Sequence, residues 1–319
     1  MSDEVLLCLT EYRYVLRTFI PYVKYYITNN KYCQWYCRQK WEILRDFHRF
    51  FPKIHLSVID FFGGKRYNKC VMERYEHCKE FQVKYCDADF KDELKTSAAL
   101  SLMEEVACSS ADELGFGYAY VKPRGYAFMV TNICAEFTRP IMLGEIVTVK
   151  TWPTPPSYVV FGREYKFLSS TGETLMNASS RWCMVDMNTG KLLQSRLIDN
   201  QDYSKYNTEK ALDGVKWKIP AFSPEEGELR FTLTIANSEY DHNMHVNNTR
   251  YADYCFNCFT VAQLADKKLR RFSISYVKQC KEGETLRFYL KRAEDGSYLA
   301  HGFNGLGEVV VQSQITFDE

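Results

Sequence analysis

The feature that most restricts the fold is an internal repeat, because residues 72–319 contain one structural pattern twice. In the first copy, the helical spacing of TSAALSLMEEVACSSADEL (96–114) precedes the stretches FTRPIMLGEIVTVKTW and REYKFLSSTGETLMNASSRWCMV. In the second copy, TRYADYCFNCFTVAQLADKKL (249–269) precedes YVKQCKEGETLRFYLKR and SYLAHGFNGLGEVVVQSQITF. The repeat predicts two similar units in tandem.

The two copies also share a register, since Phe137 precedes Gly144 by the same seven residues that separate Tyr276 from Gly283. Each copy predicts a short strand, one long helix and several alternating strands joined by turns such as SSTGE, MNTGK and EDGS. A long helix wrapped by an antiparallel sheet is the hotdog arrangement, and one copy needs a second to cover its sheet edge. We therefore predict an α+β double hotdog with two long helices, each wrapped by an antiparallel sheet.

The expected domains are an N-terminal hotdog at 72–215 and a C-terminal hotdog at 216–319, preceded by an atypical segment, 1–71. That segment holds 12 Lys and Arg against 6 Asp and Glu and no alanine, which leaves 29 against 34 for the rest of the chain. Three explanations remain open for it. It is a basic, aromatic arm that contacts a membrane surface or a partner, a small helical extension, or upstream sequence that precedes a true start at Met72.

Composition excludes several classes of protein. The net charge of +1 gives no indication of a nucleic-acid or membrane partner, and no apolar run reaches the roughly 18 residues of a membrane span. The N-terminus lacks the order of a signal peptide, so we expect a cytoplasmic protein with reduced cysteines. The pair Cys255-x-x-Cys258 has no second pair and lies within a helical pattern, so we expect no metal site.

The densest group of chemical side chains is DHNMHVNN (241–248), which directly precedes the helical pattern of the second copy. Asp241 and Asn243 are typical of a turn that caps a helix, and His245 taken alone is typical of packing. Polar side chains at the alternating positions 241, 243 and 245, together with the distant thiol of Cys280, favour an active site instead. In the first copy, DADFK occupies the approximate place of this stretch without an imidazole, and Pro140 and Ile141 align with Gln279 and Cys280.

The motif resembles the acyl-acyl carrier protein (acyl-ACP) thioesterases of plants and bacteria. The matching residues are Asp241, Asn243, His245, Val246, Asn247, Asn248 and Tyr251, with Cys280 lying 35 residues after His245. GEIVTVKTW and TGETLMNASSRWCMVDMNTGKLL extend the resemblance to the first half, so that it covers about residues 73–319. It implies hydrolysis of the thioester of fatty acyl-ACP, which releases free fatty acid and ends chain elongation. We expect no cofactor.

Elementary chemistry assigns roles to these residues. Thioester hydrolysis needs an activated nucleophile, a proton carrier and donors for the oxyanion. His245 can carry the proton and Asn243 can orient the imidazole or the carbonyl, while the start of the following helix offers free N–H groups. Asn247, Asn248 and Gln279 are expected to support the site.

Two mechanisms remain open. In the first, His245 activates Cys280 and a covalent acyl-enzyme forms. In the second, which we favour, a water molecule attacks, with Asp241 or His245 as the base. In the plant enzymes that this chain resembles, a glutamate precedes the cysteine, but here that residue is Gln279, which cannot accept a proton at neutral pH.

The first half is expected to shape the acyl pocket, with Leu100 and Met103 as candidate lining residues. The run KKLRR at 267–271 closes the expected second helix and is a candidate contact for the acidic carrier protein, through Lys267, Lys268, Arg270 and Arg271.

Three rival functions stay open: an acyl-CoA thioesterase, a hotdog hydratase or dehydratase, and a non-catalytic hotdog sensor of acyl thioesters. The sequence does not fix the preferred acyl chain length or the preference between acyl carrier protein and coenzyme A. It also leaves the oligomeric state open, and a homodimer is one possibility.

Overall fold

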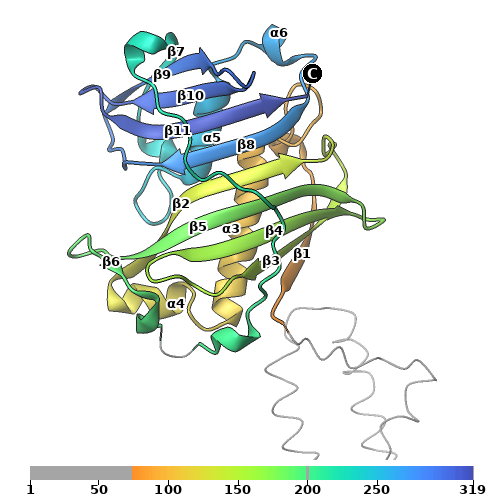
Figure 1. Cartoon of the computed structure of the whole chain (residues 1–319), viewed down its shortest axis with the longest axis vertical. Helices are drawn as coiled ribbons and strands as arrows, with labels where there is room; N and C mark the ends of the chain where they lie inside the picture. Colours follow the sequence, from red (N-terminus) through yellow and green to blue (C-terminus); the bar gives the residue numbers. More distant parts are fainter. Residues whose placement is uncertain (1–73, 199–200, 319) are drawn as a thin grey trace, which may run out of the picture. The chain divides into compact units, whose positions relative to one another are not determined.

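A computed structural model describes residues 74–198 and 201–318 of the protein (Figure 1). The segment 1–71, for which the sequence left three explanations, lies outside these described residues. Within them, no helix is both long and apolar enough to cross a membrane.

Each half contains a main helix and five long antiparallel strands. The elements of the first half are β1 (His77–Gln82), α3 (Thr96–Glu113), α4 (Tyr118–Val121), β2 (Tyr126–Phe137), β3 (Ile146–Pro153), β4 (Phe161–Ser169), β5 (Thr174–Asp186) and the short β6 (Leu192–Leu193). Those of the second half are β7 (Glu228–Thr234), α5 (Asn248–Phe256), α6 (Val261–Leu264), β8 (Leu269–Tyr276), β9 (Thr285–Arg292), β10 (Tyr298–Phe303) and β11 (Val309–Phe317).

The strands form one continuous antiparallel sheet in the order β1-β3-β4-β5-β2-β8-β11-β10-β9-β7, with β6 paired to β5 (Figure 1). The second half of this order is the first half reversed, since β8, β11, β10, β9 and β7 correspond to β2, β5, β4, β3 and β1. The two halves join where β2 pairs with β8, and across this seam Nε of Arg271 lies 3.0 Å from a carboxylate oxygen of Glu136. The double hotdog is thus confirmed, with the two sheets fused into one.

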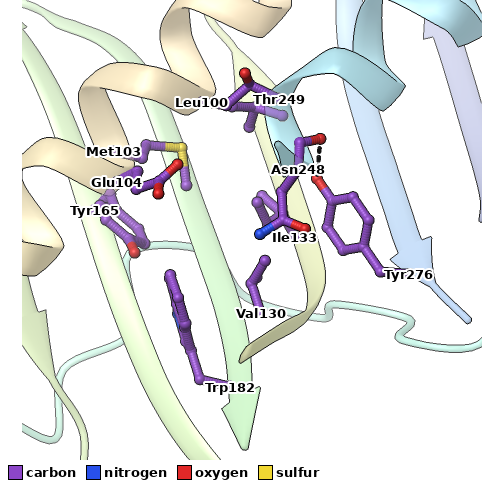
Figure 2. Close-up of a pocket in the computed structure, with 10 residues that line it drawn as sticks. All are labelled: Leu100, Met103, Glu104, Val130, Ile133, Tyr165, Trp182, Asn248, Thr249 and Tyr276. Carbon is purple, nitrogen blue, oxygen red and sulfur yellow. Dashed lines mark hydrogen bonds between the residues drawn. The ribbon is translucent and has the colours of Figure 1, made fainter. Parts of the chain in front are cut away.

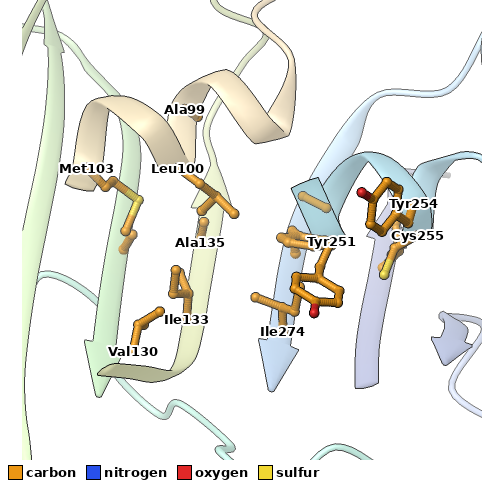
Figure 3. Close-up of a cluster of buried hydrophobic side chains, with 14 of the residues drawn as sticks. Ala99, Leu100, Met103, Val130, Ile133, Ala135, Tyr251, Tyr254, Cys255 and Ile274 are labelled. Carbon is orange, nitrogen blue, oxygen red and sulfur yellow. The ribbon is translucent and has the colours of Figure 1, made fainter. Parts of the chain in front are cut away.

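Helices α3 and α5 cover the same face of this sheet, each on its own half (Figure 1). The core lies between helices and sheet. Figure 3 shows Leu100 and Met103 of α3 facing Val130 and Ile133 of β2, while Tyr251 of α5 lies against β8. Burial of this apolar face is the main force that holds α3 on the sheet.

The second main helix is shorter than expected. The first matches its prediction, but α5 ends at Phe256 instead of continuing to residue 269. The cause is local: the Thr260 side chain accepts a hydrogen bond from the Gln263 backbone, and the Gln263 side chain accepts one from the Thr260 backbone. This capping box begins the separate one-turn helix α6. The prediction that 267–271 closes a helix is therefore wrong, because the run leads into β8.

The connection between the halves crosses the face of the sheet opposite the helices (Figure 1). There, the buried carboxylate of Glu164 on β4 accepts hydrogen bonds from Ser179, from Nζ of Lys210 at 3.0 Å and from the backbone of Ala211 at 3.1 Å. These bonds fix the connection to the first half. The division of the chain at residues 215 and 216 stays a prediction.

Candidate active site

Residues 241–247 form a tight turn that Asp241 holds together. Its Oδ1 accepts hydrogen bonds from the backbone N–H groups of Asn243, at 2.8 Å, and His245, at 3.2 Å. The Asp241 backbone N–H donates to the His245 carbonyl at 2.8 Å, and Met244 adopts a positive φ of 61°. Among the described residues, no hydrogen bond or ion pair of the Asn243 or His245 side chain is found, so the backbone and Asp241 hold the turn.

Asn247 ends the turn and caps α5. Its side-chain oxygen accepts hydrogen bonds from the backbone N–H and the hydroxyl of Thr249, at 2.8 and 2.7 Å. The cap occupies one of the free N–H groups expected at this helix start. Among the described residues, the backbone N–H of Asn248 has no acceptor and remains the free donor of the first turn.

A cavity of about 770 Å³ lies between the turn and the first half. The turn contributes a polar wall made of His242, Asn243, His245 and Asn247, together with Met244. The first half supplies the remaining wall, in which large apolar and aromatic side chains predominate: Phe116, Tyr118, Val121, Phe128, Phe161, Trp182, Met187, Ile198, Tyr203 and Tyr206. The volume is that of a pocket for a small molecule, and its apolar part suits a hydrocarbon chain.

A second, much smaller cavity of about 20 Å³ lies beside the first (Figure 2). Leu100 and Met103, the expected acyl-pocket residues, line this small cavity and not the large one. The two cavities share Glu104 and Trp182. In Figure 2, the Glu104 carboxyl group on α3 and the Asn248 side chain on α5 both project into the small cavity.

Cys280 lies in the hydrophobic core and is fully buried. Burial raises the pKa of its thiol, while a hydrogen bond with the Tyr251 hydroxyl acts in the opposite direction. It lines neither cavity, and no described contact joins it to His245. Gln279 is exposed and also lies outside both cavities. The structure therefore brings His245 and Asn243 to one cavity wall and keeps Cys280 apart.

The basic run lies beside the other half of the molecule. Nζ of Lys91, in the first half, donates a hydrogen bond to the Lys267 carbonyl at 2.9 Å. Arg270 and Arg271 both pair with Glu136, so part of their charge is compensated. Among the described residues, two cations line the large cavity: Lys122, which lies over the Tyr118 ring, and the buried Arg163, which donates hydrogen bonds to the hydroxyls of Ser110 and Thr151.

Two residues at the cavity received no role from the sequence. His242 lines the large cavity, with its ring centroid 5.6 Å from that of Tyr118. The pKa of the Glu104 carboxyl group is raised by burial and by the nearby Asp241, and lowered by His242. A signal for Glu104 was present, because it lies four residues after Leu100 and so shares the apolar face of α3.

Comparison with known proteins identifies the family and related structures. The model of the acyl-ACP thioesterase N-terminal domain matches residues 74–197, and that of the C-terminal domain matches 224–319. The chain is 26% identical over 148 residues to a chloroplastic palmitoyl-acyl carrier protein thioesterase of Arabidopsis thaliana, which is 45% of this chain and 36% of that protein. It is 18% identical over 234 residues to oleoyl-acyl carrier protein thioesterase 2 of the same plant, with coverages of 69% and 64%. The chain spans less than two thirds of the length of either relative.

Two solved structures share the fold over 76% of this chain. An acyl-ACP thioesterase from Bacteroides thetaiotaomicron gives a TM-score of 0.68 at 22% identity and is covered over 98% of its length. The 12:0-ACP thioesterase from Umbellularia californica gives 0.69 at 18% identity, with 97% covered. Since the two domain models together match more than half of the chain, one on each hotdog, the protein belongs to the acyl-ACP thioesterase family.

Proposed function

We propose that the protein hydrolyses the thioester of a fatty acyl group carried on acyl carrier protein and releases the free fatty acid. The observation that carries this proposal is the large cavity, which combines an apolar wall from the first half with the His245 and Asn243 side chains from the second. The apolar wall would hold the acyl chain. The polar wall would hold the thioester, where proton transfer is required.

In this proposal a water molecule attacks the carbonyl carbon of the thioester. Asn243 orients the substrate carbonyl. The oxyanion is stabilised at the start of α5, where Asn247 lines the large cavity and, among the described residues, the backbone N–H of the next residue, Asn248, has no acceptor. His245 protonates the departing sulfur. The sequence offered Asp241 or His245 as the base that takes the proton of the water, and Asp241 already uses Oδ1 to hold the turn.

The alternative role of Cys280 as nucleophile has less support. A nucleophilic cysteine reacts as the thiolate, and burial raises the pKa of this thiol. Cys280 is also fully buried and lines no described cavity. We therefore assign Cys280 to the packing of the second half, next to Tyr251.

The carrier contact at Lys267, Lys268, Arg270 and Arg271 stays a prediction, and Lys122 at the cavity wall is a second candidate. A cytoplasmic location likewise stays a prediction.

The test is thiol release from ACP thioesters and coenzyme A thioesters of short, medium and long acyl chains. We expect the wild type and Cys280→Ala to release thiol from the ACP thioesters, and His245→Ala to lose activity. Equal loss in Cys280→Ala would favour the covalent route. Release from coenzyme A thioesters alone would make the protein an acyl-CoA thioesterase. Tight binding without release would make it a sensor, and water addition to an intact thioester would make it a hydratase.

A further inference from the structure

Glu104 is a carboxyl group in an unusual position. It lies in the middle of α3, on the helix face that packs against the sheet, and lines both cavities. Among the described residues, no hydrogen bond or ion pair of its side chain is found. Its neighbour Glu105, in contrast, pairs with Lys79 at 2.5 Å on the surface. A half-buried carboxyl group without a structural partner costs stability, so its position calls for a function.

The groups around Glu104 are those of the candidate active site. Asp241 and His242 face it from the turn, and Tyr276 faces it from β8. On its own helix, Glu105 and Cys108 are the charged or titratable neighbours. Burial and Asp241 raise the pKa of Glu104, and His242 opposes them. The raised pKa makes Glu104 a stronger base than an exposed carboxylate, as general base catalysis requires.

The turn of the second half has one carboxylate, Asp241, and its Oδ1 is engaged in the turn. Glu105 and Asp112 also line the large cavity, but both side chains are exposed, and Glu105 pairs with Lys79. The position directly before Cys280 holds Gln279, which cannot accept a proton. We propose that Glu104, on the helix of the first half, is the general base of the reaction. This inference rests on the proposed hydrolase function and assigns a catalytic residue to it.

The Glu104 carboxylate takes a proton from the attacking water while the oxygen of that water forms a bond to the thioester carbon. The tetrahedral intermediate collapses, the carbon–sulfur bond breaks, and protonated His245 gives a proton to the departing sulfur. Glu104 gives its proton to solvent and His245 takes one up from solvent, so both groups return to their starting states, and the products are a fatty acid and a free thiol.

The decisive experiment is the pH dependence of kcat/KM for thiol release from acyl-ACP, measured across the range in which carboxyl and imidazole groups titrate. Glu104→Gln should lower kcat/KM by roughly 100- to 10,000-fold, and Glu104→Asp should recover part of the activity. His242→Gln removes a group that lowers the pKa of Glu104, so the fall in activity at acidic pH should begin at a higher pH.

Thermal unfolding separates catalysis from structure. Because burial disfavours the charged carboxylate, Glu104→Gln should keep or raise the Tm at neutral pH while it loses activity. The matched control is Glu113→Gln on the same helix. The Glu113 carboxylate pairs with Nδ1 of His77 at 3.0 Å and lies outside both cavities, so this variant should keep wild-type kcat/KM.

Three results would overturn the inference. The first is wild-type activity in Glu104→Gln, which would leave the hydrolase function standing. The second is a lowered Tm in Glu104→Gln together with an unmoved pH profile in His242→Gln, which would mean a structural role. The third is absence of thiol release by the wild type itself, which would remove the proposed function and the role of Glu104 with it.

Discussion

The two halves of the molecule contain the same turn with different side chains. In the first half, Oδ1 of Asp89 accepts hydrogen bonds from the backbone of Lys91, at 2.8 Å, and Glu93, at 3.1 Å, just as Asp241 does two and four residues ahead. The residue before Glu93, Asp92, has a φ of 59°, and Met244 has 61°. In both halves the turn leads into the main helix.

The side chains at equivalent positions do different things. In the first half, Lys91 and Glu93 form an ion pair at 2.7 Å. In the second half, Asn243 and His245 stand in their places, form no such pair and line the cavity. Asp89 and Asp241 accept the same backbone hydrogen bonds, although the turn of the first half has no imidazole. The aspartate therefore serves the turn itself, whereas the histidine is not needed to form it.

The largest effect should separate the histidine from its counterpart. His245→Gln is expected to lower the rate of thiol release by roughly 100- to 10,000-fold, because it removes the proton carrier. Glu93→Gln, which breaks a half-buried ion pair outside both cavities, should leave the rate unchanged. Steady-state kinetics on acyl-ACP measures both variants. Similar losses in the two would mean that the turns do not differ in function.

The second prediction compares two buried positions, Ile141 and Cys280, which align in the repeat. Ile141→Ala should lower the free energy of unfolding by about 2–5 kcal/mol, since it leaves a cavity in the core. Cys280→Ala removes one sulfur atom and should cost about 1 kcal/mol, with thiol release preserved. Urea unfolding and the same rate assay test the pair. A rate collapse in Cys280→Ala would assign the thiol to the chemistry.

The third prediction addresses the two aspartates. Asp89→Ala and Asp241→Ala each remove the acceptor of two backbone bonds and should each destabilise the protein by about 1–2 kcal/mol. Only Asp241→Ala should reduce activity, since its turn carries His245. Asp241→Asn keeps the accepting oxygen and should retain most of both properties. Loss of activity in this conservative variant, without loss of Tm, would show that the carboxylate itself reacts.

The smallest effect concerns the carrier protein. Lys122→Ala is expected to raise the KM for acyl-ACP by about threefold at low salt, because the lysine lines the same cavity as the turn at residues 241–247. Lys268 belongs to the basic run 267–271, which contacts the first half. Lys268→Ala should therefore change the KM less. A larger rise for Lys268→Ala would restore the basic run as the docking surface.

Much of the fold was readable because the repeat is local. The spacing of Gly144 and Gly283 aligned the halves, and both glycines adopt a positive φ, of 82° and 81°, in equivalent turns. The length of α5 was not readable from periodicity, because the apolar spacing continues past Phe256 while the capping box at Thr260 competes with the helix.

The candidate site divides in the same way. The sequence pointed to Asn243 and His245, which line the cavity, and to Cys280, which does not. It missed Glu104, which lies 137 residues before Asp241 in the chain. Nothing in the spacing of one helix says which distant turn its polar residue will face.

By itself, therefore, the sequence determined the two hotdog units, the turn before the second helix and the family, because each depends on residues that are neighbours in the chain. The tertiary structure alone decided which side chains share a cavity. Pairing of β2 with β8 brings the two halves into one sheet, and this contact sets α3 of one half against the turn of the other. Burial and the resulting pKa changes are properties of that packing, so they appear only when the chain is folded.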